Sequence, residues 1–283
     1  MRNLRDERRS VSALAGATVA IIGAGKMGFA MLSGLARGDK PARVVVVEPK
    51  PTPEAAGFCR AQGFELMSAV DAGAEPVGAL ALAIKPQTLE AAAPELHPLV
   101  GPQTLVLSIL AGKRIADLSA RLPAQAFVRA MPNTPAAIGR GITGAFASAA
   151  VNQRQRGLAQ ALLASLGEVE WIDREELMDA LTAVSGSGPA YVFLLAECLA
   201  AAGEAAGLPA DLAMRLSRAT VAGAGELLRR SPELPPSTLR ENVTSPGGTT
   251  AAALGVLMAE EGMKPLLERA IAAAARRARE LSG

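Results

Sequence analysis

The sequence predicts an α/β protein in which a doubly wound parallel sheet, residues 1–172, precedes an entirely helical part, residues 173–283. Three observations predict this fold class. Short apolar runs alternate with helical segments up to Trp171, a pattern typical of repeated β-α units. Residues 44–47 are four successive valines, as expected for a strand that is covered on both faces. After Trp171 no strand is expected, and alanine, roughly a fifth of the chain, favours closely packed helices.

The expected strands of the first part are short runs of apolar, often β-branched residues, most of them closely followed by glycine or proline. In chain order they are residues 18–22, 43–47, 80–84, 104–109, 126–130, 144–149 and 168–172. Helices are expected between them, for example at residues 29–35, 88–96 and 115–122.

The second part reads as a succession of helices. They are expected at residues 173–184, 189–206, 209–230, 246–260 and 264–281. Pro189, Pro209 and Pro246 suit the first helical position, because the N–H that proline lacks has no partner there.

Composition excludes several classes of function. The net charge is only +2 and aromatic residues make up 3% of the chain, so the basic surplus and stacking platforms of a nucleic-acid binder are missing. One histidine and two distant cysteines, Cys59 and Cys198, form no Cys/His metal cluster and no expected disulfide. Residues 1–10 carry charges of both signs, as in a short terminal tail, and no signal-type apolar stretch follows. Because no long apolar run is free of Gly, Pro or charge, we expect a soluble, cytoplasmic protein that does not enter a membrane.

The strongest local motif is Gly23-Ala24-Gly25-Lys26-Met27-Gly28, which directly follows an expected strand and opens an expected helix. In this context the motif predicts a Rossmann-type dinucleotide site. Gly23 allows the tight turn, Gly25 lets the backbone approach a pyrophosphate, and Gly28 lets helix and strand pack closely. Helix N-terminal amides, from Lys26 and Met27 onward, would face the anion.

Cofactor choice depends on the end of the second strand. Glu48 lies 20 residues after Gly28, where an acid usually binds the ribose 2′-hydroxyl and disfavours a 2′-phosphate. Lys50 would instead pair with that phosphate. The two residues point in opposite directions, with a weak preference for NAD.

Three further segments carry more hydroxyl, glycine and proline residues than packing requires: residues 131–135, 184–191 and 243–250. Two of them place Ser, Thr and Gly at the start of expected helices, where free amides and the positive dipole end bind carboxylates. Simple helix capping is the alternative explanation. With these segments, the glycine turn, residues 83–87 and residues 108–112, the chain closely resembles the pyrroline-5-carboxylate reductase family from about residue 18 to residue 281.

The resemblance implies hydride transfer from NADPH or NADH, more often NADPH, to the imine carbon of L-1-pyrroline-5-carboxylate, giving L-proline in the last step of proline biosynthesis. It implies that the helical domain binds the substrate and interlocks with its twin in a homodimer, and that dimers commonly join into larger rings. Glu48 departs from the NADPH-preferring members, which tend to have small polar or basic residues there. This departure concerns the cofactor preference and not the family.

The resemblance also implies site residues by position. Those expected on the nicotinamide side of the cofactor are Ala83, Ile84, Lys85, Pro86 and Ala111, and Asn133 of the Met-Pro-Asn-Thr-Pro segment is expected at the cofactor as well. Those expected to cradle the substrate carboxylate and ring nitrogen are Ser245, Gly247, Gly248, Thr249 and Thr250. Glu233 stands where the family often has an acid near the substrate ring.

The scarcity of side chains that could donate a proton favours an imine over a ketone as the substrate. The β-hydroxyacid dehydrogenases, which share this layout, place a lysine four residues after the second glycine of a Gly-x-Gly segment, but here that residue is Val192. His97, between two prolines, is expected in a surface loop. A protonated cyclic imine accepts hydride without a protein acid, and Thr250 is the candidate for a catalytic hydroxyl near its nitrogen. A reductase of six-membered cyclic imines and a non-catalytic dinucleotide-binding protein remain alternatives.

Overall fold

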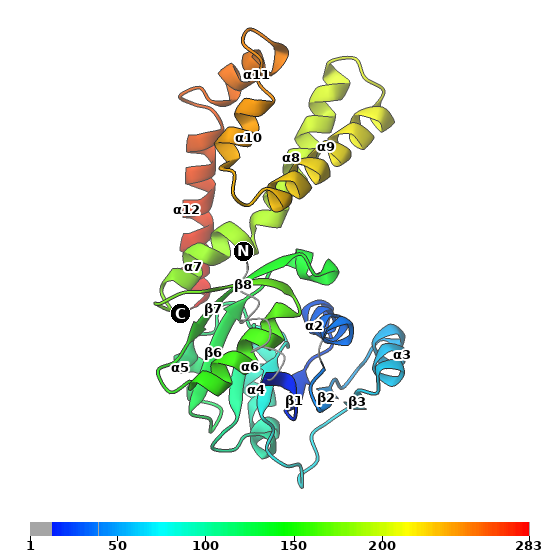
Figure 1. The fold of residues 1–283 in the computed structure, drawn as a ribbon. Helices are drawn as coiled ribbons and strands as arrows, with labels where there is room; N and C mark the ends of the chain where they lie inside the picture. The colour runs from blue at the N-terminus through cyan, green and yellow to red at the C-terminus, as the bar shows by residue number, and fades with distance from the viewer. Residues whose placement is uncertain (1–12, 39, 283) are drawn as a thin grey trace. The chain divides into compact units, whose positions relative to one another are not determined.

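The computed structural model describes residues 13–38 and 40–282, so the tail expected at residues 1–10 lies outside the described part (Figure 1). The chain divides into two compact units. The first contains the described residues up to Gly186 together with Ala275–Ser282, and the second is Ser187–Ala274. The structural division therefore falls within the helical part and returns the end of the chain to the first unit. A functional boundary at residues 172–173 stays a prediction.

The first unit is built on one eight-stranded sheet with the order β3-β2-β1-β4-β5-β6-β7-β8. The strands are β1 (Thr18–Ile22), β2 (Arg43–Val47), β3 (Glu65–Met67), β4 (Ala79–Leu82), β5 (Leu105–Ser108), β6 (Ala126–Met131), β7 (Gly141–Ala147) and β8 (Gly167–Trp171). The predicted doubly wound sheet is confirmed, but β7 runs antiparallel to β6. Residues 132–140 join these two strands, and this link is too short for the dozen or more residues that a parallel crossover requires. The short edge strand β3 was not expected.

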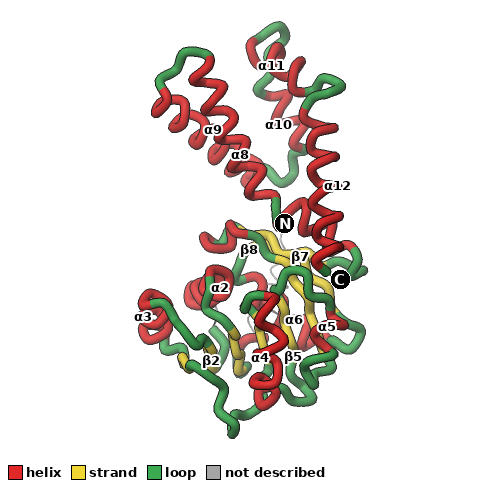
Figure 2. The backbone as a smooth tube through the Cα atoms, turned by 180° about the vertical axis from the view of Figure 1, so that it is seen from behind, coloured by secondary structure: helices red, strands yellow, loops and turns green. Residues whose placement is uncertain are grey.

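Helices cover both faces of the sheet, as Figures 1 and 2 show. They are α2 (Lys26–Arg37), α3 (Pro53–Gln62), α4 (Leu89–Leu96), α5 (Ile115–Ser119) and α6 (Gln153–Ala164), with short 3₁₀ turns at Pro86–Thr88, His97–Leu99 and Thr134–Ile138. The valines of β2 alternate between two buried clusters. Val44 and Val46 pack in the cluster that includes residues of α2 and α6. Val45 and Val47 pack in the cluster that includes residues of α4, which confirms a strand covered on both faces.

The remaining helices differ from the expected ones in several of their bounds. They are α7 (Leu177–Leu181), α8 (Gly188–Ala205), α9 (Ala210–Arg230), α10 (Pro236–Asn242), α11 (Thr249–Leu257) and α12 (Met263–Leu281). The helix predicted at residues 246–260 is present but shorter: Pro246 lies in a turn and is not the first helical residue, and α11 begins at Thr249. The helix predicted at 173–184 is shorter and continues as a π-helical turn, Thr182–Gly186. Pro209 is the residue before α9, not its first helical residue.

The second unit has little core of its own. Within it α8 and α9 pack against each other, and a Cβ on Gly203 would lie 3.3 Å from the Cβ of Ala213. Large apolar side chains are left uncovered, among them Phe193 (61% exposed) and Val256 (74% exposed). The stretch Leu177–Ala205 also has the length and mean hydropathy (1.3) of a membrane span, by composition alone. Exposed apolar surface of this kind is typical of an interface with another protein.

Candidate functional site

The carboxyl ends of β2, β1, β4 and β5 lie side by side, because these strands are parallel neighbours. Hydrogen bonds between main-chain atoms continue past the strand ends. The amides of Gly23, Ala83 and Ile109 each donate to the last residue of a neighbouring strand, at 2.9, 2.8 and 3.2 Å. The structure therefore brings the glycine turn beside the segment that begins at Ala83. In open parallel sheets, ligands bind at this edge, where the strand order reverses.

The three glycines of the turn meet different surroundings. Gly23 has a φ of +97°, and a Cβ on it would lie 2.8 Å from the carbonyl oxygen of Ala83. A Cβ on Gly28 would overlap the carbonyl oxygen of Gly23. Gly25, by contrast, is exposed and has no atom within 4 Å of its Cβ position. Gly23 and Gly28 therefore serve the packing of the turn, and Gly25 leaves open space above it.

The start of α2 fits a dinucleotide pyrophosphate. Gly25 is the N-cap of α2 and no side chain caps the helix, so its first amides stay free. Lys26 is exposed and Met27 is half-buried at this end of the helix. Free amides at a helix N-terminus, together with the open space at Gly25, are what a pyrophosphate requires.

Glu48 lies directly after β2 and its carboxylate is held against the glycine turn. The amide of Ala24 donates to Glu48 Oε2 at 2.9 Å, and the amide of Lys50 donates to Oε1 at 3.0 Å. The amide of Glu48 itself donates to Met67 of β3 at 3.0 Å. The structure thus places the predicted acid beside the predicted phosphate turn. The role of Ala24 was missed, because the motif identifies its glycines and not the amide between them.

The residues expected near the nicotinamide follow β4 and β5. Ala83 and Ile84 are half-buried at the end of β4, and Lys85 is exposed before the 3₁₀ turn Pro86–Thr88. Ala111 is exposed in the loop after β5. Both segments extend from the edge of the sheet that carries the glycine turn, and their contacts with a cofactor stay a prediction.

Asn133 has partners inside the first unit. Its Oδ1 accepts a hydrogen bond from the amide of Ile142 at 3.0 Å, and its Nδ2 donates to the carbonyl of Ser185 at 3.1 Å. The buried Asn133 side chain therefore joins the loop after β6 to the π-helical turn. This positioning role was not foreseen, and direct cofactor contact by Asn133 stays a prediction.

The predicted substrate segment lies in the second unit, between α10 and α11. Gly247 has a φ of +68°, and the amide of Gly248 donates to the carbonyl of Ser245 at 3.0 Å, which closes a turn. Gly248 is the N-cap of α11, and no side chain caps this helix. Thr249 and Thr250 are therefore the first residues of a helix whose initial amides stay free. This arrangement fits a carboxylate.

Glu233 and this turn are separated in the chain by α10. Glu233 is exposed on the connection before α10, whereas Ser245 follows α10. A helix of seven residues spans about 10 Å, and the two segments join its opposite ends. A substrate contact by Glu233 stays a prediction.

The remaining titratable groups that the structure describes include His97 and the two cysteines. His97 is exposed, and its Nε2 lies 2.9 Å from the carbonyl oxygen of Arg121. Burial raises the pKa of the Cys59 thiol, and both cysteines are free. Residues 13–38 and 40–282 hold no group of three His, Cys, Asp or Glu side chains that is arranged for a metal ion.

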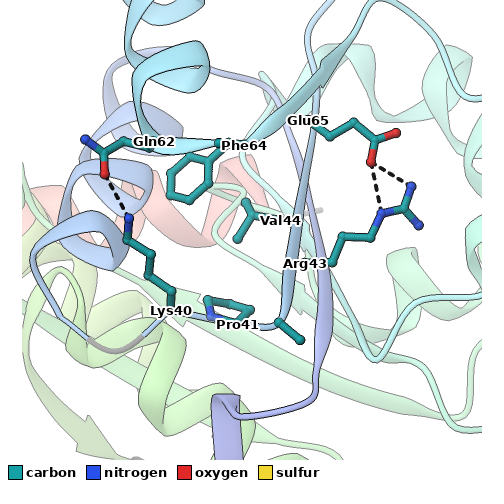
Figure 3. Close-up of a pocket in the computed structure, with 9 residues that line it drawn as sticks. Lys40, Pro41, Arg43, Val44, Gln62, Phe64 and Glu65 are labelled. Carbon is teal, nitrogen blue, oxygen red and sulfur yellow. Dashed lines mark hydrogen bonds and ion pairs between the residues drawn. The ribbon is translucent and has the colours of Figure 1, made fainter.

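A hollow of about 240 Å³ lies elsewhere, beside Arg43 and Glu65, where β2 and β3 begin. Figure 3 shows that its polar side chains are already paired: Lys40 donates to Gln62 at 2.9 Å, and Arg43 donates to Glu65. It is at the amino ends of the strands, the opposite edge of the sheet from the glycine turn. The hollow is therefore no part of the candidate site.

Comparisons with known proteins agree with this arrangement. A family model described as pyrroline-5-carboxylate reductase dimerisation matches residues 175–281, and one described as NADP oxidoreductase, coenzyme F420-dependent, matches residues 18–112. A pyrroline-5-carboxylate reductase from Pseudomonas aeruginosa is 39% identical over 93% of this chain and 96% of its own length.

Solved structures are similar over almost the whole chain. A pyrroline-5-carboxylate reductase from Coxiella burnetii has a TM-score of 0.87 and 34% identity, covering 95% of this chain and 99% of its own. A pyrroline carboxylate reductase from Plasmodium falciparum, solved with NADP bound, has a TM-score of 0.77 and 27% identity, covering 94% of this chain and 98% of its own.

Proposed function

Because the chain belongs to the pyrroline-5-carboxylate reductase family, we propose that it reduces L-1-pyrroline-5-carboxylate to L-proline, the last step of proline biosynthesis. The observation that carries the proposal is the pair of uncapped helix N-termini, one on a dinucleotide-type turn and one on the Ser245–Thr250 segment. A site for a dinucleotide and a site for a small carboxylate are what this reaction needs.

NADPH or NADH supplies the hydride when bound. The free amides at the start of α2 bind the pyrophosphate, and Gly25 leaves room for it. Ala83, Ile84, Lys85, Pro86 and Ala111 line the nicotinamide side, as in the family resemblance. Asn133 supports this region by holding the loop after β6 to the π-helical turn, a contact of 3.1 Å.

The substrate carboxylate is bound by the Ser245–Thr250 turn. The uncapped amides of α11 and the hydroxyls of Ser245, Thr249 and Thr250 supply the donors. Thr250, half-buried in the first turn of α11, places its hydroxyl near the ring nitrogen. Glu233 is a further candidate near the ring.

No protein acid is required for this reaction. The imine nitrogen is protonated before the step, hydride adds to the ring carbon, and the electron pair of the C=N bond moves to nitrogen. The chain binds the iminium and holds it in the reactive orientation. This agrees with a helical part whose one lysine, Lys264, lies near its end.

The exposed apolar helices of the second unit belong to a dimerisation domain of this family. A second copy of the chain covers Phe193 and its neighbours in a homodimer, and such dimers join into a larger ring. The uncovered stretch Leu177–Ala205 is then an interface and not a membrane span. Two free cysteines fit a reducing compartment, the cytoplasm.

A substrate panel tests the proposed function. Initial rates of dinucleotide oxidation are measured at 340 nm with pyrroline-5-carboxylate and with its six-membered homologue, each with NADH and NADPH. We expect turnover with a kcat/KM that is higher for the five-membered ring. One methylene separates two substrates by about 1–3 kcal/mol, so the difference is measurable. A preference for the six-membered ring supports the related imine reductase, and tight dinucleotide binding without turnover supports a non-catalytic binder.

A further inference from the structure

Glu48 directly follows β2, the position from which an acid binds the adenosine ribose in dinucleotide-binding folds, and its carboxylate is held by main-chain amides. Each of its oxygens accepts one amide hydrogen bond, from Ala24 at 2.9 Å and from Lys50 at 3.0 Å. A carboxylate has about four acceptor positions, so each oxygen keeps one for a ribose hydroxyl. The donor Ala24 belongs to the glycine turn itself, which sets the distance between pyrophosphate and acid.

The loop that follows Glu48 is poor in donors for a phosphate. Of residues 49–53, three are prolines and have no amide hydrogen. The Lys50 amide already donates to Glu48, and the Thr52 hydroxyl oxygen accepts from the Ala55 amide at 3.1 Å, capping α3. Apart from the Lys50 side chain, the donors left in this fully described loop are the amide and the hydroxyl hydrogen of Thr52. A 2′-phosphate needs several such donors or an arginine fork.

Lys50 is the one cation in this fully described loop, and its charge favours a 2′-phosphate. The Lys50 side chain is exposed beside Glu48 and would attract a phosphate. It is an ammonium on a flexible stem in water, where such an attraction is screened. The Glu48 carboxylate, by contrast, is held at the turn by the Ala24 amide, where its charge repels a phosphate and its oxygens accept from hydroxyls.

We propose that this chain uses NADH in preference to NADPH, with the Glu48 carboxylate binding the adenosine ribose hydroxyls and excluding a 2′-phosphate. This inference rests on the proposed function, in which the glycine turn holds the reductant. It assigns Glu48 as the residue that determines cofactor specificity.

The test compares the two dinucleotides with the full-length protein. Dissociation constants for NADH and NADPH are measured by fluorescence titration without substrate, and kcat/KM for each is measured with pyrroline-5-carboxylate. We expect NADH to be favoured at least tenfold in both measurements. Equal values, or values that favour NADPH, overturn the inference and leave the proposed function standing if proline forms. Binding of neither dinucleotide overturns both.

Two variants test whether Glu48 causes the cofactor preference. Glu48→Gln removes the charge and keeps the shape, and we expect it to lower the NADH:NADPH ratio of kcat/KM at least tenfold. Glu54→Gln removes an equal charge from the exposed first turn of α3 and serves as the matched control, with a shift below twofold. An unchanged ratio in Glu48→Gln, or an equal shift in both variants, contradicts the role of Glu48. The wild-type preference is informative even if Glu48→Gln does not fold.

Discussion

Two glycines of the turn have different roles: Gly28 is required for packing, and Gly25 leaves space for a ligand. Gly28 has no room for a side chain, because a Cβ would overlap the carbonyl oxygen of Gly23. Gly25 has an ordinary φ of −67° and open space around its Cβ position. The motif predicts this division from position, and the structure shows the contacts behind it.

The variants Gly25→Ala and Gly28→Ala therefore fail in different ways. Gly28→Ala overpacks the turn, and we expect a loss of about 2 kcal/mol in the free energy of unfolding. Gly25→Ala should change stability by less than about 0.5 kcal/mol, while its methyl group raises the dinucleotide dissociation constant at least tenfold. Urea denaturation and dinucleotide titration measure the two effects. Equal destabilisation by both variants would contradict this division.

Thr250 is the one residue whose side chain is proposed to act near the imine nitrogen of the substrate. We expect Thr250→Ala to lose at least ~10-fold in kcat/KM, about 1.4 kcal/mol, and Thr250→Ser to keep most of the activity. His97→Ala, at an exposed 3₁₀ turn, should be nearly silent. Steady-state kinetics on folded variants measures these changes in kcat/KM. A folded Thr250→Ala variant with the wild-type kcat/KM would contradict this role, and a large loss in His97→Ala would contradict the argument that no protein acid is needed.

Much of the site at residue scale was predictable from the sequence. The glycine turn and Glu48 were predictable because a strand, a turn and a helix lie close together in the chain. The bonds of Asn133 to Ile142 and Ser185 were not, because they join segments up to 52 residues apart. No local pattern encodes such a contact.

At the scale of elements, a buried ion pair joins three segments of the first unit. Arg129 on β6 donates to Glu175 Oε1 at 3.0 Å, and the two side chains are 4% and 20% exposed. The same oxygen accepts the amide of Ile115, at the start of α5, at 2.9 Å. Glu175 thus anchors the segment that leads into α7.

Removing one partner of this pair leaves a buried charge. We expect Glu175→Ala to lower the free energy of unfolding by about 3 kcal/mol, because the Arg129 guanidinium keeps its desolvation and loses its partner. Glu176→Ala, at the exposed neighbouring residue, is the matched control and should change it by less than about 0.5 kcal/mol. Chemical denaturation gives both values. A Glu175→Ala variant as stable as the control would show that the pair does not anchor this segment.

The order of the elements was mostly predictable, and the exceptions have physical causes. The antiparallel β7 follows from a link that is too short for a crossover. The π-helical turn Thr182–Gly186 carries hydroxyls of Thr182 and Ser185 that donate to carbonyls four residues earlier, at 2.7 and 3.0 Å. Propensity scales do not register such a local distortion of a helix.

At the scale of the whole molecule, the second unit requires a partner. Its described residues bury few side chains, and apolar residues such as Phe193 remain exposed on α8. Surfaces of this kind mark interfaces between proteins. The abundance of alanine in the sequence predicted close helix packing, but it did not show which faces pack within one chain and which pack between copies.

A charge on the uncovered face of α8 should break the assembly. Phe193→Asp loses about 2 kcal/mol of apolar burial in each copy and adds an unpaired carboxylate at the interface. We expect size-exclusion chromatography with light scattering to show a shift to a smaller species. Gln125→Asp, which adds the same charge at an exposed site of the first unit, should leave the mass unchanged. A Phe193→Asp protein with the wild-type mass would place the interface elsewhere.

The most direct test of the account follows the hydride. The enzyme is supplied with pyrroline-5-carboxylate and NADH or NADPH that carries deuterium at the transferable position, and the product is analysed by mass spectrometry and NMR. The account predicts proline with one deuterium on the ring carbon that formed the imine. Proline without deuterium, or dinucleotide oxidation without proline, would contradict it.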